Sequence, residues 1–173
     1  MVIMQSETNK AETEIPQKPL GVSGLNGWLV LVQIGIYATL LLSLIRFFNE
    51  YLSVLDPEVW SLLTSKDSEF YHPLWGPTII FEMAVLIIMF VFCLYILFNF
   101  YSKKAILPKL MIIFYAGSLA ARVIDYILVQ LIPVANEIGD GVALRSLIQG
   151  VVVCLIWIPY FLKSERVKNT FIN

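Results

Sequence analysis

Two charged residues three positions apart, Arg122 and Asp125, lie inside an apolar run of the sequence that covers residues 106–132. A charged side chain near the middle of a membrane-spanning helix costs about 2.5–3.5 kcal/mol on insertion scales. At this spacing the two side chains share one helical face and can pair with each other. The same face carries Gly117 and Ser118. One side of this helix is therefore expected to be small and polar and to be covered by the rest of the molecule.

Further polar residues interrupt two of the other apolar segments. Glu82 lies near the start of one segment, and Arg145 and Gln149 lie near the start of the last. In an antiparallel bundle, with a rise of about 1.5 Å per residue, these positions and Arg122 and Asp125 fall in the same half of the bilayer. The sequence therefore predicts one neutral intramembrane cluster of Glu82, Arg122, Asp125, Arg145 and Gln149. Arg122 is expected to form an ion pair with Asp125 or with Glu82.

Two interpretations of this cluster stay open. The charges can pair to fix the register of the helices, or they can line a functional polar cavity that opens to the outside. No nucleophile with a matching base and no phosphate-binding loop accompanies them, so an enzyme is not expected. His72 stands alone in a proline-rich stretch and is interpreted as a turn residue. Neither a metal nor another cofactor is predicted.

The composition indicates an integral membrane protein. Of the 173 residues, 58% are hydrophobic and 14% are charged, and four apolar segments approach the length of about 20 residues that a bilayer requires. We predict an all-α, four-helix transmembrane bundle. The expected spans cover residues 28–45, 77–100, 106–132 and 142–162. The net charge of −1 gives no support for a nucleic-acid partner.

The remaining segments are expected to flank or connect the spans. Residues 1–20 are interpreted as a disordered tail rather than a signal peptide, and residues 21–173 as one membrane domain. The connection between the first two spans is long and acidic, and after the cap residue Asp56 it holds a short amphipathic segment. Residues 163–168 are interpreted as a basic tail. Gly35, Thr39 and Ser43 form a small-residue stripe that permits close helix contact.

The distribution of basic residues predicts the orientation. Only Arg46 and Lys66 fall on the side of the long connection between the first two spans. The other side carries Lys10, Lys18, Lys103, Lys104, Lys109, Lys163, Arg166 and Lys168. The positive-inside rule then places both termini in the cytoplasm and the long connection outside.

Two polar features inside the spans are expected to be structural. Gln33 is expected to make a hydrogen bond between helices. Cys93 and Cys154 lie in apolar segments without a CxxC spacing and are expected to be reduced.

Two stretches of this sequence resemble a known family. GLNGWLVLVQIGI at the first span and IWIPYFLKSERVKNTFI at the last are similar to the bacterial domain-of-unknown-function 2569 family. The resemblance covers residues 21–173 and implies a small four-span protein of the bacterial inner membrane. It implies no activity, substrate or catalytic residue.

Three function classes are compatible with these sequence features. The favoured class is a non-enzymatic binding, accessory or assembly factor, with the lipid bilayer around it and a membrane-protein partner or a second copy as its contact. The alternative is a small oligomeric transporter or channel that uses the polar cluster. A membrane enzyme, such as a thiol oxidoreductase or a lipid-modifying enzyme, has the least support because CxxC and a nucleophile–base pair are both missing.

Overall fold

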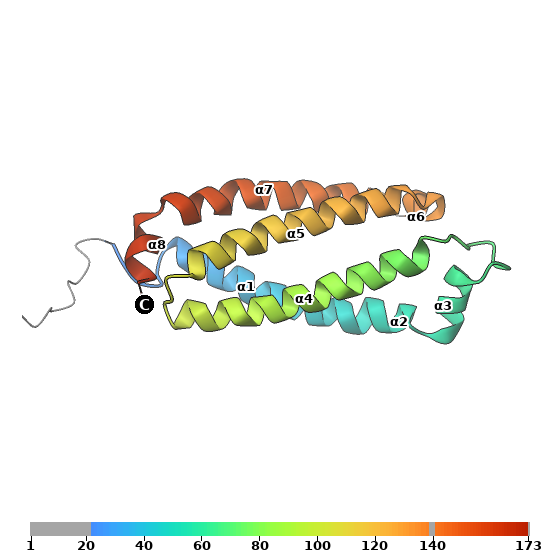
Figure 1. Cartoon of the computed structure of the whole chain (residues 1–173), viewed down its shortest axis with the longest axis horizontal. Helices are drawn as coiled ribbons and strands as arrows, with labels where there is room; N and C mark the ends of the chain where they lie inside the picture. Colours follow the sequence, from blue (N-terminus) through green and yellow to red (C-terminus); the bar gives the residue numbers. More distant parts are fainter. Residues whose placement is uncertain (1–21, 139–140, 173) are drawn as a thin grey trace, which may run out of the picture.

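The computed structural model describes residues 22–138 and 141–172, and within these ranges all regular structure is helical (Figure 1). Four stretches are long and apolar enough to cross a membrane, which confirms the predicted transmembrane bundle. They are Trp28–Val54, Trp75–Tyr101, Leu107–Gln130 and Val142–Lys163. The predicted tail of residues 1–20 lies outside the described residues.

The four spans pack in a chain rather than in a closed ring. α1 (Trp28–Arg46) packs on α4 (Trp75–Tyr101), α4 on α5 (Leu107–Gln130), and α5 most extensively on α7 (Val142–Lys163). Figure 1 shows the α5–α7 pair and the α1–α4 pair diverging toward one end. We call this the distal end; it carries α3 (Pro57–Thr64) and α6 (Pro133–Ile138).

The opposite, proximal end is closed by aromatic and aliphatic packing. Trp28 on α1 contacts Trp157 and Tyr160 on α7, with ring centroids 6.2 and 6.5 Å apart. Tyr115 on α5 stacks on Trp157 at 6.5 Å. The buried apolar core lies mostly toward this end and includes Leu29, Val32, Ile36, Ile96, Phe100, Leu107, Met111 and Phe161. The bundle is therefore V-shaped, joined at the proximal end and open at the distal end.

The first span is longer than predicted. Instead of ending at Arg46, the helix continues through a π-helical turn, η1 (Phe47–Tyr51), and through α2 (Leu52–Val54). Arg46 is held by an ion pair with Glu50 one turn later, which supports the helix rather than ending it. The break comes at Asp56 and Pro57, so Arg46 and Tyr51 belong to the membrane bundle.

The connection between the first two spans folds against the distal end. The Asp56 side chain accepts a hydrogen bond from the Glu58 amide at 2.9 Å, which confirms the predicted helix cap. α3 packs against the start of α4, where Trp60 and Thr64 lie beside Gly76. His72 Nδ1 accepts a hydrogen bond from the Leu74 amide at 3.3 Å, and this confirms its role as a turn residue.

The two cysteines lie in separate helix contacts. Both are buried free thiols. Cys93 donates to the Ile36 carbonyl oxygen at 3.7 Å and so links α4 to α1, whereas Cys154 donates to the Tyr115 carbonyl oxygen at 3.3 Å and links α7 to α5. Their positions agree with the expected structural role.

The small-residue stripe on α1 does not form the predicted close helix contact. A side chain added at Gly35 would meet nothing within 4 Å, and Thr39 and Ser43 donate to the carbonyl oxygens of Gly35 and Thr39 within their own helix. The open V leaves this face of α1 without a neighbouring helix. Gln33 does bond between helices, to the Tyr101 hydroxyl on α4, as predicted.

The segment interpreted as a basic tail is a short helix that closes the proximal end. In α8 (Glu165–Thr170), Ser164 caps the first turn, and Val167 and Thr170 are buried. Phe171 packs its ring on Phe100 at 5.7 Å. The apolar residues between the charges explain the difference, because they need a partner surface and find it at the end of the bundle.

Replacing Thr170 with valine is expected to destabilise the protein by about 1 kcal/mol. Its hydroxyl accepts a hydrogen bond from the Gly24 amide at 2.9 Å and joins the two ends of the described chain. Thr64→Val is the matched control, since Thr64 bonds only to Trp60 in its own helix. Thermal unfolding in one detergent should show a lower melting temperature for Thr170→Val than for Thr64→Val. Equal melting temperatures would show that the hydrogen bond between Gly24 and Thr170 does not contribute to stability.

Candidate functional site: an intramembrane polar cavity

The open distal half of the V contains a cavity of about 680 Å³. Its walls come from α1, η1, α4, α5, α6 and α7, and they are apolar over much of their area. The apolar lining includes Leu42, Phe81, Val85, Leu86, Met89, Phe114, Val129, Val142 and Leu144. The volume falls within the range of about 300–1,000 Å³ that is typical of small-molecule sites.

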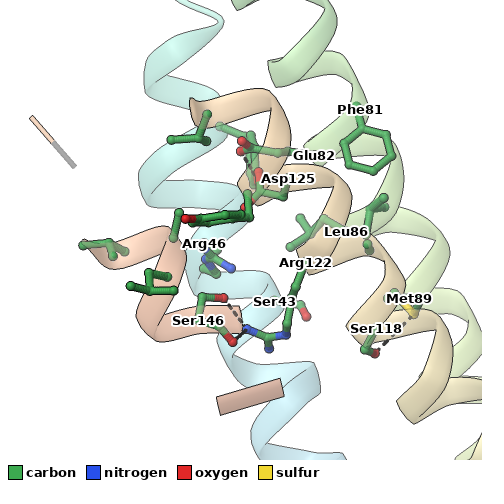
Figure 2. A pocket seen from close by; sticks show the side chains of 18 of the residues that line it. Ser43, Arg46, Phe81, Glu82, Leu86, Met89, Ser118, Arg122, Asp125 and Ser146 are labelled. Carbon is green, nitrogen blue, oxygen red and sulfur yellow. Dashed lines mark hydrogen bonds between the residues drawn. The ribbon is translucent and has the colours of Figure 1, made fainter. Parts of the chain in front are cut away.

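Four charged residues line this cavity, two basic and two acidic. Arg46 comes from α1, Glu82 from α4, and Arg122 and Asp125 from α5 (Figure 2). The formal charges sum to zero, as the sequence predicted, but the second arginine is Arg46 rather than Arg145. The three helices thus bring together side chains that lie up to 79 positions apart, from Arg46 to Asp125.

The two carboxyl groups form one side of the site. Glu82 and Asp125 lie next to each other across the α4–α5 contact (Figure 2). Tyr51 donates to Glu82 Oε2 at 3.2 Å from the π-helical turn. Asp125 Oδ1 is buried and has no hydrogen-bond partner within the described residues. This side therefore offers a buried acceptor beside a second carboxyl group.

Arg122 lies on the other side and points toward α7. Its Nη1 donates to the Ser146 carbonyl oxygen at 3.2 Å and to the Ser146 hydroxyl. The side-chain stem passes over Gly150, where an added Cβ would lie only 2.8 Å from Arg122 Cδ. Gly150 is buried and leaves room for the stem, and this room lets the guanidinium reach Ser146.

The predicted ion pair of Arg122 with Asp125 or Glu82 is therefore wrong within the described residues. The only ion pair there joins Arg46 and Glu50, at 3.2 Å. Because Gly150 has no side chain, the Arg122 stem can lie against α7, whereas Asp125 faces Glu82 on α4. The basic and the acidic side chain of α5 thus contact different neighbouring helices, α7 and α4.

The prediction that Arg145 and Gln149 join the cluster is also corrected. Both are exposed on α7, and neither lines the cavity. Ser146, one position after Arg145, faces the cavity instead, and successive helical positions point about 100° apart. The depth of Arg145 in the membrane was inferred from its sequence position, but depth does not determine which face it occupies.

The polar lining residues that were not predicted to belong to the cluster include Arg46, Tyr51 and Ser146. Arg46 was interpreted as the end of the first span, and Tyr51 as part of the following loop. Apolar residues at Phe47, Phe48, Tyr51 and Leu52 continue a helical spacing beyond Arg46, and this signal favours a longer helix. Ser146, Gly150 and Cys154 repeat every four residues and indicate the close α5–α7 contact.

Three serine hydroxyl groups around the cavity are engaged in structural hydrogen bonds. Ser43 donates to the Thr39 carbonyl oxygen at 2.7 Å, Ser118 to Met89 Sδ at 3.8 Å, and Ser146 bonds to Arg122. His72, the single histidine of the sequence, does not line the cavity. Across the described ranges, no group of three or more His, Cys, Asp or Glu side chains could hold a metal ion.

The fold and this cavity define a class: a small four-span membrane protein with an intramembrane polar site that is open at one end. The sequence profile of the family described as "Protein of unknown function (DUF2569)" matches residues 22–172, and the chain belongs to this family. It is 28% identical over 100 residues to the inner membrane protein YdgK of Escherichia coli strain K12. That alignment covers 58% of this chain and 61% of YdgK. No solved structure shows a significant match.

The similarity to an inner membrane protein and the four spans indicate the same location for this protein. It is a multi-pass protein of the bacterial inner membrane. Its segments at residues 22–24 and 170 meet at the proximal end, so the two ends of the described chain lie on the same side of the bundle. The orientation of that side stays a prediction from the basic residues.

Proposed function

We propose that this protein is a non-enzymatic ligand-binding protein of the inner membrane, which acts as an accessory factor through its distal cavity. The observation that carries the proposal is the convergence of Arg46, Glu82, Arg122 and Asp125 on one cavity with apolar walls. A purely structural set of charges would be expected to pair off and fill the space between the helices. Here the charges surround open space.

The orientation proposed with this function places both termini in the cytoplasm. The basic residues cluster at the proximal side in the chain, around residues 103–109 and 163–168. The cavity then opens toward the periplasmic side. A ligand would reach it from the outer leaflet of the inner membrane or from the periplasm.

Filling the cavity should remove the bound ligand while leaving the bundle folded. Ala121 lines the cavity, and the open volume can take a phenyl ring, so Ala121→Phe is expected to occupy the binding space. Ala120, the preceding residue on α5, is exposed, and Ala120→Phe is the matched control. The measurement is native mass spectrometry of the full chain released from inner-membrane vesicles in a mild detergent.

We expect a bound molecule on the wild type and on Ala120→Phe, and its loss from Ala121→Phe at an unchanged melting temperature. Equal occupancy of Ala121→Phe and wild type would contradict the proposal. The absence of any bound molecule from the folded wild type would also count against it.

A small oligomeric transporter is the second candidate, and the adjacent carboxyl groups favour it. Pairs of acidic side chains inside a membrane occur in proton relays and ion pathways. Glu82 and Asp125 lie side by side in the cavity. Four spans give little room for a transport path, so this function requires self-association. Cross-linking in the membrane separates the two candidates, since a strictly monomeric protein supports binding alone.

A further inference from the structure

We propose that the cavity binds a zwitterionic amphiphile whose head group carries a phosphate and a primary ammonium, of the phosphoethanolamine type. The phosphate lies between Arg46 and Arg122, and the ammonium lies at the Glu82–Asp125 side. This inference rests on the proposed function and names the class of its ligand.

The two arginines supply unused hydrogen-bond donors to the cavity. Arg122 uses only Nη1, toward Ser146, and Arg46 uses only Nε, toward Glu50. Within the described residues their other guanidinium N–H groups have no partner. Figure 2 shows both guanidinium groups in the space beside α1, α5 and α7. Guanidinium groups form paired hydrogen bonds with the oxygens of phosphates, so an anion between them would satisfy both.

The carboxyl groups of Glu82 and Asp125 provide the binding site for the positively charged group of the ligand. Asp125 Oδ1 is a buried acceptor without a partner in the described part of the chain, and Glu82 lies beside it. A primary ammonium donates up to three hydrogen bonds, whereas a quaternary ammonium donates none. Arg122 and Asp125 come from the same helix but lie on different sides of the cavity. A ligand that meets both must therefore carry its negative and its positive charge on separate groups, as a phosphoethanolamine head group does.

The shape of the site favours an amphiphile over a soluble ion. α1 and α7 meet through Trp28 and Trp157 at the proximal end and diverge toward the distal end (Figure 1). Residues of both helices line the cavity, including Leu42 on α1 and Leu144 on α7. The inner wall beyond the charged residues is apolar and includes Leu86, Met89 and Phe114. An acyl chain can lie against this wall while the head group meets the charges.

Binding of defined lipids to the purified full chain tests the inference. The probes are phospholipids with identical acyl chains and phosphoethanolamine, phosphocholine or phosphoglycerol head groups, together with soluble inorganic phosphate. We expect the phosphoethanolamine lipid to bind at least tenfold more tightly than the other two lipids. Inorganic phosphate should bind weakly, because it lacks both the ammonium and the chain.

Substitutions of the charged lining residues test where the head group binds. Arg122→Gln should weaken phosphoethanolamine-lipid binding at least tenfold, and Arg145→Gln is the matched control because Arg145 is exposed on α7 outside the cavity. Asp125→Asn should weaken the phosphoethanolamine lipid and leave the phosphoglycerol lipid unchanged. Arg122→Lys keeps the charge but loses the paired donors, so it should weaken binding even if Arg122→Gln does not fold.

Equal binding of the three lipids, or equal effects of Arg122→Gln and Arg145→Gln, would overturn the inference. Inorganic phosphate binding as tightly as the lipid would identify a free anion as the ligand and would overturn it as well. In each case the Ala121→Phe experiment reports separately on the proposed function, because it detects any molecule in the cavity.

Discussion

Replacing Gly150 with alanine is expected to destabilise the protein by about 1–3 kcal/mol, as overpacked substitutions do. The added Cβ would lie 2.8 Å from Arg122 Cδ and 3.3 Å from Leu119 Cδ1. Arg122 cannot avoid this contact with its flexible tip alone, because Cδ belongs to the stem. The side chain must move away from α7, and its bonds to Ser146 must lengthen or break.

Gly35→Ala is the matched control for this prediction. Gly35 also lies inside a membrane-spanning helix, but a Cβ at this position meets nothing within 4 Å. Alanine is favoured over glycine in a helix interior by about 1 kcal/mol, so Gly35→Ala should melt at the same temperature as the wild type or higher. If thermal unfolding shows Gly150→Ala as stable as Gly35→Ala, Arg122 is not held by the contact with α7.

The membrane fold could be predicted from sequence because each span carries its own signal. An apolar run of about 20 residues requires no knowledge of its neighbours. The predictions that a charged residue ends an apolar helix were less successful. Arg46 does not end the first span, since Glu50 pairs with it and the helix continues to Val54. The segment after Lys163 is a helix because Val167 and Phe171 need a buried surface.

The cavity could be predicted only in part. Glu82, Arg122 and Asp125 stand out as charges in apolar spans, and the structure places all three at the cavity wall. Which neighbour each side chain faces depends on the rotation of its helix and on gaps in the adjoining helix. The space above Gly150 determines the direction of Arg122, and a sequence read one span at a time does not show it.

The proposed function requires that the distal half of the bundle holds a cavity open to water or to solutes. Cysteine accessibility on α1 tests this claim directly, with Cys93→Ala and Cys154→Ala as the background. Ser43 lines the cavity, whereas Gly35, two turns earlier on the same helix, does not line it, and a Cβ added at Gly35 would meet nothing within 4 Å. A membrane-impermeant, charged methanethiosulfonate reagent is applied to right-side-out and to inverted inner-membrane vesicles.

We predict that Ser43→Cys reacts at least ten times faster than Gly35→Cys, and only in right-side-out vesicles, because the cavity opens at the distal end, which the proposed orientation places on the periplasmic side. Reaction of Ser43→Cys only in inverted vesicles would keep the cavity and reverse the proposed orientation. If Ser43→Cys reacts no faster than Gly35→Cys in either kind of vesicle, the charged residues do not surround an open site, and the proposed function is contradicted.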